Sequence, residues 1–338
     1  MRIALISTLA TRVRPRGSGS VESLVWLLAS EFTRLGHQVT VFACAGSDVP
    51  CELVTTLPGA YGVNGAPDDW QLCEWINLCR AVEQSGRFDV LHSHAYLWGM
   101  PLQSFSKAPM VHTLHVCPDE SAARHWRMIG GVCVTAISEY QWTEFPDLKP
   151  AAVIHHGVNA AQFSFREAPE DYVCYFGRFT IGKGPQAAIT AARDLGLRLL
   201  LAGPRNEYFA KKIAPLVDGQ TVDYIGPVSG VARDRLLGGA RALLYPLQEP
   251  EPFGLVPVEA MMCGTPVAAI RRGAVAEIVE DGITGHCAEP GGDFVAAAER
   301  AMTLNRKRVR DRAAARFSAE RMAQSYLAVY EQLLRKGV

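Results

Sequence analysis

Short apolar runs alternate with stretches of helical periodicity along the whole chain, and this alternation predicts the fold class. In the first half, apolar runs that are candidates for buried strands occupy residues 2–7, 38–43, 90–92, 110–114 and 132–136. After the first run, apolar residues recur at helical spacing from Leu24 to Leu35, and Gly36 ends the pattern. Strands alternating with helices favour a parallel sheet, so this half is predicted to be α/β and doubly wound.

The same alternation restarts after a polar, proline-containing break at residues 163–169. Further strands are predicted at 172–176, 197–202, 222–225 and 242–245, with helices at 185–195, 208–216 and 233–238. A last amphipathic helix is predicted over 319–334, with Met322, Tyr326, Val329, Tyr330 and Leu333 on one face. We therefore expect one domain at 1–165, a second at 166–318, and a C-terminal helix within 319–338.

Length, charge and cysteine usage restrict the class of protein. A chain of 338 residues with 49% hydrophobic side chains suits two globular domains, and 34 basic residues balance 34 acidic ones. This balance removes the electrostatic case for a nucleic-acid partner. No apolar run reaches the roughly 18 residues of a membrane span, and the N-terminal stretch does not resemble a signal peptide. The nine scattered cysteines form no CxxC pair and suit buried free thiols of a reducing cytoplasm.

The first candidate binding loop lies between the first predicted strand and helix, at residues 14–20. Gly17 and Gly19 allow a close backbone approach, and the following helix start suits a phosphate. A tight turn without a ligand fits the same residues. Glu22 stands where a dinucleotide fingerprint needs its third glycine, so that fingerprint is poorly met.

Two further loops carry charged residues after predicted strands. Arg178 and Lys183 flank a glycine and suit a clamp on a diphosphate, although two solvated surface cations would look the same. Glu251 and Glu259 lie eight residues apart in an otherwise apolar segment. Gly254 is expected to turn the chain into a short helix over 255–263, whose start suits a phosphate while the carboxylates accept hydrogen bonds from sugar hydroxyls.

Histidines, aromatic residues and a basic stretch each allow two interpretations. His92, His94, His112 and His115 suit either a metal cluster or strand-end histidines in a cleft, and no carboxylate or cysteine joins them at ligand spacing. Four aromatic residues either line the acceptor side or pack in the core, namely Tyr96, Trp98, Trp126 and Trp142. The basic helical stretch 306–316 is interpreted as a solvated face.

The segment 251–267 resembles the E-x7-E signature of retaining GT-B glycosyltransferases, in the large fourth family. Other landmarks of that family follow in order at the glycine-containing first loop and at residues 111–115, 136–139, 156–159, 177–184 and 201–204. The resemblance implies two Rossmann-like domains facing each other across a cleft, with the C-terminal helix crossing back to the first domain. The second domain is then expected to hold a nucleotide-sugar donor and the first domain an acceptor.

The resemblance also implies roles for individual residues. Arg178 and Lys183 are expected to grip the donor diphosphate, Glu251 to bond the donor sugar, and Glu259 to bond the ribose. Backbone N–H groups at the start of the short helix are expected to meet the phosphate or sugar, from Gly254, Leu255 and Val256. His115 is expected beside the donor sugar, and Gly19 with Ser20 at the diphosphate, where Ser20 replaces the second glycine of the usual pair.

The expected reaction is retaining transfer of a hexose to a hydroxyl of a small-molecule or glycan acceptor, without a metal or other cofactor. The chain has no DxD motif for a divalent ion, and two cations with a helix start suit a diphosphate leaving group. UDP-glucose is the first choice of donor and GDP-mannose the second. The alternatives are a nucleotide-sugar 2-epimerase, a GDP-mannose-dependent transferase acting on a lipid or glycan, a nicotinamide oxidoreductase and a non-catalytic binder. A cytoplasmic location with at most weak membrane contact is expected.

Overall fold

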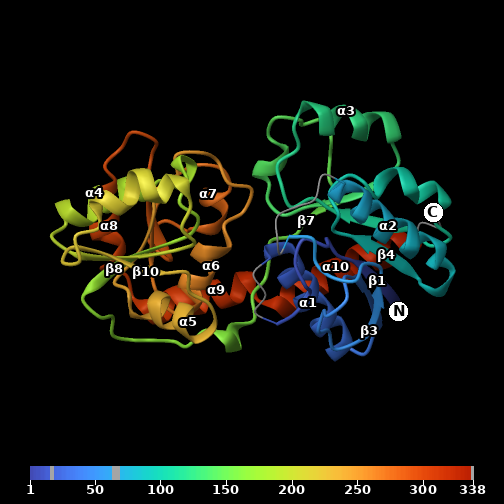
Figure 1. The fold of residues 1–338 in the computed structure, drawn as a ribbon, viewed down its shortest axis with the longest axis horizontal. Helices are drawn as coiled ribbons and strands as arrows, with labels where there is room; N and C mark the ends of the chain where they lie inside the picture. Colours follow the sequence, from blue (N-terminus) through green and yellow to red (C-terminus); the bar gives the residue numbers. More distant parts are fainter. Residues whose placement is uncertain (16–18, 63–68, 336–338) are drawn as a thin grey trace. The chain divides into compact units, whose positions relative to one another are not determined.

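The computed structural model contains two α/β units, each built on one parallel sheet (Figure 1). The structure describes residues 1–15, 19–62 and 69–335. The first unit comprises Met1–Gly157 and Ala319–Val338, and the second comprises Val158–Ser318. The expected boundary was 165/166, whereas the chain divides after Gly157. The intervening residues belong to the second unit because Val158 N–H donates to Phe317 O and Arg310 donates to Phe163 O, both at 2.9 Å.

The sheet of the first unit has seven strands in the order β3-β2-β1-β4-β5-β6-β7, all parallel. Its strands are β1 (Arg2–Ile6), β2 (Gln38–Ala43), β3 (Glu52–Thr55), β4 (Val90–Ser93), β5 (Met110–Thr113), β6 (Cys133–Ala136) and β7 (Ala152–Val153). Strands β3 and β7, which were not predicted, form the two edges. Both are short and half-exposed, so neither carries the apolar run that marks a buried strand.

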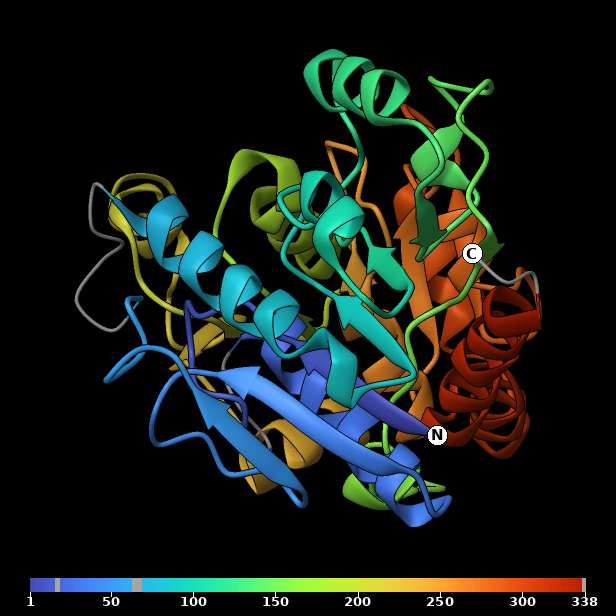
Figure 2. The same ribbon diagram turned by 90° about the vertical axis from the view of Figure 1, so that its right-hand side faces the viewer.

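Alternate residues along β1 separate the two cores of this sheet. Ile3 and Leu5 pack with α1 (Ser20–Arg34) and α10 (Ala319–Arg335), whereas Ala4 and Ile6 pack with α2 (Trp70–Glu83) on the opposite face. Helix α2 lies over β1 and β2 in Figure 2. Helix α3 (Glu120–Ile129) joins a further apolar cluster with β6 residues. The predicted return of the C-terminal helix to the first unit is confirmed.

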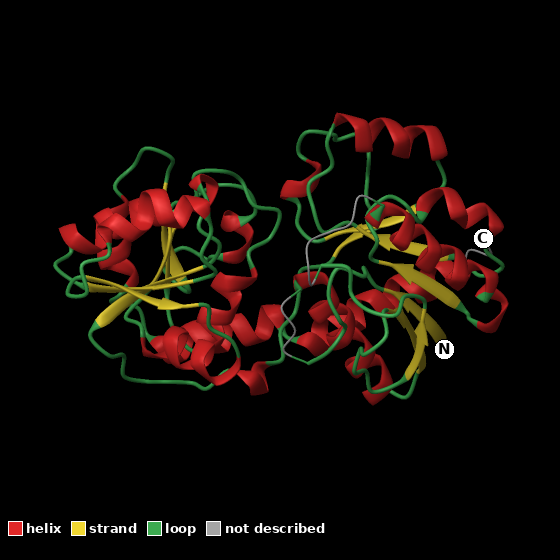
Figure 3. Cartoon of the chain, viewed as in Figure 1, coloured by secondary structure: helices red, strands yellow, loops and turns green. Residues whose placement is uncertain are grey.

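The second sheet has six parallel strands in the order β10-β9-β8-β11-β12-β13. They are β8 (Tyr172–Phe176), β9 (Arg198–Ala202), β10 (Val222–Gly226), β11 (Leu243–Tyr245), β12 (Val267–Ile270) and β13 (Gly285–Ala288). Its helices are α4 (Pro185–Asp194), α5 (Gly230–Gly239), α6 (Leu255–Met262), α7 (Val275–Ile278), α8 (Phe294–Ala301) and α9 (Arg306–Phe317). Figure 3 shows helices around the strands of each unit, which confirms the doubly wound α/β fold class.

Three local predictions need correction. Residues 208–216 do not form a regular α-helix, since a π-helical turn at Phe209–Ile213 leads into a 3₁₀ turn at Ala214–Leu216, where Pro215 removes a backbone donor. Strands β12 and β13 were not predicted. The nine cysteines are free thiols, but Cys117 is exposed and only Cys44, Cys174 and Cys263 are fully buried.

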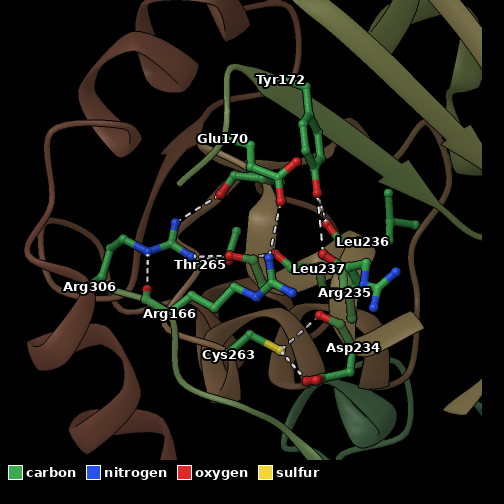
Figure 4. A network of polar contacts seen from close by, with 12 residues as sticks. Arg166, Glu170, Tyr172, Asp234, Arg235, Leu236, Leu237, Cys263, Thr265 and Arg306 are labelled. Atoms are coloured by element: carbon green, nitrogen blue, oxygen red, sulfur yellow. Dashed lines mark hydrogen bonds and ion pairs between the residues drawn. The ribbon is translucent and has the colours of Figure 1, made fainter. Parts of the chain in front are cut away.

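The basic stretch on α9 is the predicted solvated face only in part, because Lys307, Arg308 and Arg312 are exposed whereas Arg306 is buried. Arg306 is buried and donates to the carbonyls of Arg166, Ala240 and Gly238 and to the hydroxyl of Thr265 (Figure 4). These oxygens satisfy the guanidinium inside the second unit. Arg310 and Arg316 on the same helix also donate to backbone carbonyls. Helix α9 is therefore fastened to the second unit largely through inward-facing arginines.

No helix within the described part of the chain is both long and apolar enough to cross a membrane.

Candidate active site

The loop after β8 is held in a defined shape at the carboxyl edge of the second sheet. Tyr175 donates its hydroxyl hydrogen to Arg178 O at 2.8 Å, and Asn206 donates to Phe179 O at 2.8 Å. The Thr180 hydroxyl caps a 3₁₀ turn, η5 (Ile181–Lys183), by accepting from Lys183 N–H at 3.4 Å. The Arg178 side chain is exposed and has no ion-pair partner among the described residues. A cation is thus presented on a fixed backbone at the strand end.

Lys183 and Glu251, from two different loops, form an ion pair. Lys183 Nζ lies 2.5 Å from Glu251 Oε1, and the two side chains are only 20% and 23% exposed. The loops are joined because Gly182 O accepts from Gln248 N–H at 2.8 Å and from Glu249 N–H at 3.2 Å. Gly184 has a φ of +66°, and a Cβ there would collide with Pro246 O. The close approach that brings lysine to glutamate therefore depends on this glycine.

Glu251 retains one oxygen for a ligand. Its Oε2 is buried and has no hydrogen-bond partner within the described part of the chain. The backbone at Glu251 is fixed because its carbonyl accepts from Ala274 N–H at 2.9 Å, and a Cβ on Gly273 would collide with it. A buried carboxylate oxygen without a partner costs free energy, so it marks a position where a donor group from a ligand would be stabilising.

The start of α6 lies directly after Glu251 in the sequence. Gly254 has a φ of +110°, which favours glycine, and as the N-cap residue it has no side chain to cap the first N–H groups of the helix. The first residues, Leu255 and Val256, therefore present backbone donors together with the positive end of the helix dipole. Pro257 occupies the first turn without loss of an internal hydrogen bond, as predicted.

Glu259 lies inside α6 and is paired within the second unit. Arg233 Nη1 on α5 lies 2.8 Å from Glu259 Oε1, and the carboxylate side chain is only 11% exposed. Burial raises the pKa of Glu259 to about 7, and the neighbouring guanidinium opposes this shift. The structure therefore gives Glu259 a fixed orientation before any ligand binds.

Two further arginines at this strand edge were missed from the sequence. Arg272 follows β12, and its Nε is buried without a partner among the described residues. Arg205 follows β9, and its guanidinium lies 4.9 Å from the ring centre of Tyr224. Arg272 could have been found from the sequence as a cation that follows a strand, but residues 267–270 were not predicted as a strand. Both cations add positive charge to the edge that carries Arg178 and Lys183.

In the first unit, Gly19 is the N-cap residue of α1, and Ser20 begins the helix. Thr11 N–H donates to Glu22 Oε1 at 3.0 Å, and a Cβ on Gly19 would collide with the Glu22 carboxylate and the Thr11 hydroxyl. Gly19 is therefore favoured by packing within the loop, independently of any ligand, because any other residue would displace these two side chains. The prediction for Gly17 lies outside the described residues.

His115 belongs to a chain of stacked imidazoles in the first unit. Its Nε2 lies 3.0 Å from His94 Nδ1, and its Nδ1 lies 3.5 Å from His156 Nε2. The neighbouring rings are stacked, with centroids 5.2 and 5.3 Å apart. Both ring nitrogens of His115 are thus engaged, and the longer contact to His156 is the one a ligand would open more easily. His94, already a candidate strand-end histidine, and His156, which had no assigned role, are therefore positioning candidates.

Other histidines and tryptophans of the first unit have structural roles. His92 is bonded through Nε2 to Thr113 and through Nδ1 to Tyr330, at 2.7 and 2.6 Å. Trp126 and Trp142 are buried and pack edge to face, with ring centroids 4.7 Å apart, so they do not line an open surface. Within the described residues no cluster of histidine, cysteine and carboxylate groups has the geometry of a metal site.

The buried histidines predict an acid-sensitive first unit. Burial lowers the pKa of His112 and of His115 to about 4, against 6.5 for an unperturbed imidazole. As the pH falls from 6.5 to 4, these imidazoles therefore bind protons in the unfolded chain but not in the folded unit. The free energy of unfolding of the first unit falls accordingly. We expect a loss of about 2 kcal/mol for each of these two imidazoles by pH 5.

Urea unfolding followed by tryptophan fluorescence measures this loss, since all six tryptophans lie in the first unit. His112→Asn should reduce the pH dependence, whereas replacing the exposed His125 by asparagine should leave it unchanged. Equal stability of the wild-type unit at pH 7 and pH 5 would show that these imidazoles are not held neutral.

Two parallel-sheet units of this kind, with an acidic and basic constellation at a strand edge, are the architecture of GT-B glycosyltransferases. The family model described as Glycosyl transferases group 1 matches residues 159–317, and the model described as Glycosyltransferase Family 4 matches residues 21–162. Each model covers one unit and together they span residues 21–317, so the chain is a glycosyltransferase with the GT-B fold.

Similar proteins cover almost the whole chain. A D-inositol 3-phosphate glycosyltransferase from Mycobacterium tuberculosis is 27% identical over 404 aligned positions, which cover 98% of this chain and 83% of the relative. The crystal structure of AviGT4, a glycosyltransferase involved in avilamycin A biosynthesis, has a TM-score of 0.77 and 26% identity, covering 99% and 98% of the two chains. HepE from Anabaena in complex with UDP-glucose has a TM-score of 0.72 and 19% identity, covering 98% and 100%.

Proposed function

We propose that the protein transfers a hexose, with retention of configuration, from a nucleoside diphosphate sugar to a hydroxyl of a small-molecule or glycan acceptor. The Lys183–Glu251 pair carries this proposal, because it places a cation and a carboxylate together beside the uncapped start of α6. A nucleotide sugar has a diphosphate and a polyhydroxylated ring joined at one bond. The pair therefore offers one partner for each half of such a donor.

Donor binding would exchange the partners of this ion pair. The diphosphate draws Lys183 away from Glu251, and Arg178 supplies a second cation from the same loop. As the sugar–phosphate bond breaks, negative charge develops on the leaving diphosphate. Preorganised cations and the N–H groups of Leu255 and Val256 stabilise this charge without a metal ion.

Glu251, once released, accepts hydrogen bonds from donor-sugar hydroxyls, and its unpartnered Oε2 is already available. The sugar becomes oxocarbenium-like, the acceptor hydroxyl attacks on the face that the phosphate leaves, and a phosphate oxygen takes the acceptor proton. His115 is proposed beside the donor sugar, where its low pKa keeps the ring neutral at pH 7. Glu259 is proposed for the ribose, with Arg233 holding the carboxylate in place.

UDP-glucose is the proposed donor, with GDP-mannose second. The likeness to HepE, whose crystal structures contain UDP-glucose or UDP and glucose, supports this choice. We also place the enzyme in the cytoplasm, where nucleotide sugars are available. Incubation with UDP-glucose alone, and with UDP-glucose plus candidate acceptors, tests the reaction class by product analysis. Transfer supports the proposal, whereas epimerised donor, or donor binding without reaction, contradicts it.

Activity is expected without a divalent metal. The charge on the leaving diphosphate is met by Lys183, Arg178 and the start of α6, and none of these needs an ion. Transfer rates measured in excess EDTA should therefore stay close to those measured with Mg²⁺. Complete loss of transfer in EDTA, restored by Mg²⁺ or Mn²⁺, would contradict this mechanism.

A further inference from the structure

Four half-buried aromatic rings form a continuous wall at the carboxyl edge of the first sheet. Tyr61 contacts Trp70 with ring centroids 6.2 Å apart, Trp70 contacts Trp98 at 5.0 Å, and Trp98 contacts Tyr96 at 6.0 Å. Tyr96 and Trp98 follow β4, Tyr61 follows β3, and Trp70 begins α2. In doubly wound sheets this edge is where ligands bind. We call these four residues the aromatic platform.

The backbone around the platform is strained and fixed. Tyr96 has a φ of +48° and is the only residue other than glycine with a positive φ among those the structure describes. Such a conformation costs about 1–3 kcal/mol and clusters at functional sites. Trp98 N–H donates to Ala95 O at 3.3 Å, which holds the turn that presents both rings. The fold therefore maintains an unfavourable conformation to keep these two side chains at the edge.

A buried carboxylate orients the other end of the platform. Glu74 is fully buried, and its Oε1 accepts from the Tyr61 hydroxyl and from Leu9 N–H, each at 2.8 Å. Its Oε2 has no partner in the described part of the chain. Tyr61 N–H also donates to Leu9 O at 3.2 Å, so ring and backbone are both tied to the loop after β1. These hydrogen bonds fix the Tyr61 ring in place before a ligand stacks against it.

The charges that act on the platform are negative. Besides burial, the pKa of the Tyr61 hydroxyl is raised by the carboxyl groups of Glu74 and Glu22, and the pKa of Tyr96 is raised by Asp119. Burial raises the pKa of Glu74 itself to about 7, so this group carries only part of a negative charge at pH 7. Asp69 precedes Trp70 directly and is exposed. A phosphate or carboxylate on a ligand would be repelled here, whereas an uncharged ring or a protonated amine would not.

We propose that the aromatic platform is the acceptor subsite, and that it binds a cyclic acceptor without phosphate or carboxylate groups, namely a sugar or aminosugar ring. This proposal rests on the proposed function, because it gives that reaction its second substrate. Aromatic faces stack on the apolar face of a sugar ring, and the surrounding carboxylates accept from its hydroxyl or ammonium groups. The acceptor therefore differs in charge from the D-inositol 3-phosphate that names the mycobacterial relatives.

Matched pairs of probes test the charge preference on the full chain. Affinities for myo-inositol and D-inositol 3-phosphate, and for glucose and glucosamine, are measured by tryptophan fluorescence titration. We expect the phosphorylated ring to bind at least about tenfold more weakly than its uncharged partner, and glucosamine to bind at least as tightly as glucose. Equal or tighter binding of D-inositol 3-phosphate overturns the proposal, and so does the absence of binding by every uncharged or amine-bearing probe.

Variants locate the binding on the platform. Trp98→Ala should lower the affinity for the uncharged and amine-bearing probes about tenfold, and Trp98→Phe should retain most of the wild-type affinity. Trp75→Ala is the matched control, because Trp75 lies on α2 but is exposed and outside the platform. Circular dichroism confirms that the variants fold. Equal effects of Trp98→Ala and Trp75→Ala overturn the proposal. Titration of UDP into the wild-type protein, read by melting temperature, tests donor binding separately.

Discussion

Truncating the chain after Ser318 is expected to leave the first unit unable to fold. Helix α10 buries six residues against the core of that unit, namely Ala319, Met322, Ala323, Tyr326, Val329 and Tyr330. Burying a large apolar side chain contributes roughly 1.5–3 kcal/mol, so the four larger residues together contribute about as much as the whole stability of a typical domain. The Tyr330 hydroxyl also bonds the buried His92 at 2.6 Å, and truncation would leave that imidazole nitrogen unpaired.

Far-UV circular dichroism and tryptophan fluorescence of the 1–318 chain measure this loss, because every tryptophan reports on the first unit. Tyr330→Phe is a milder version and should cost about 1–3 kcal/mol by leaving His92 Nδ1 without its partner. Leu334→Ala on the exposed side of the same helix is the control and should cost little. A truncated chain with native tryptophan emission would show that α10 is dispensable.

Lys183→Ala is expected to reduce kcat by about 10²–10³, because it removes a preorganised charge from the proposed leaving-group site. Arg178→Ala should have an effect of similar size for the same reason. The cost in stability should be modest. Arg178 has no ion-pair partner in the described part of the second unit, so its replacement should cost little. Lys183→Ala leaves the largely buried Glu251 carboxylate without its partner and should cost about 1–3 kcal/mol. Activity and stability therefore separate in these two variants.

Steady-state transfer rates and urea unfolding, measured on the same preparations, test this separation. Arg300→Ala is the matched control, since Arg300 is an exposed arginine on α8 in the same unit. It should change neither quantity. Near wild-type transfer by both Lys183→Ala and Arg178→Ala would exclude the diphosphate clamp, whatever the effect on folding.

The strand and helix pattern was readable wherever burial made the sequence periodic. The strands predicted at 38–43 and 172–176 match β2 and β8 residue for residue. Helix α6 begins where it was predicted and ends at Met262, one residue before the predicted end. Edge strands such as β3 escaped because half-exposed residues carry no apolar run. The basic helix α9 was predicted only in part, because charge alone does not tell whether an arginine faces water, as Arg308 and Arg312 do, or backbone carbonyls, as Arg306 does.

Candidate site residues were predictable where a motif gave their position, but not their partners. Glu251, Lys183 and Gly254 could be named from spacing and turn chemistry. The ion pair between Lys183 and Glu251 could not, because it depends on the packing of two loops around Gly182 and Gly184. The aromatic platform was half visible, since Tyr96 and Trp98 were candidates while Tyr61 and Trp70 were not. Ring contacts between distant segments are set by the sheet and not by local periodicity.

The sequence by itself determined the fold class and the loops that hold the candidate site, because these follow from local periodicity, turn residues and a specific motif. The return of the last helix to the first unit was implied by the family resemblance, since periodicity showed only that one face of this helix is buried. Only the tertiary structure decided which charges are paired and which polar atoms remain open. Burial keeps His112 and His115 neutral at pH 7, and loop packing leaves one oxygen of Glu251 without a partner among the described residues. Both outcomes depend on groups far apart in the chain, whose desolvation and contacts exist only once each unit has folded.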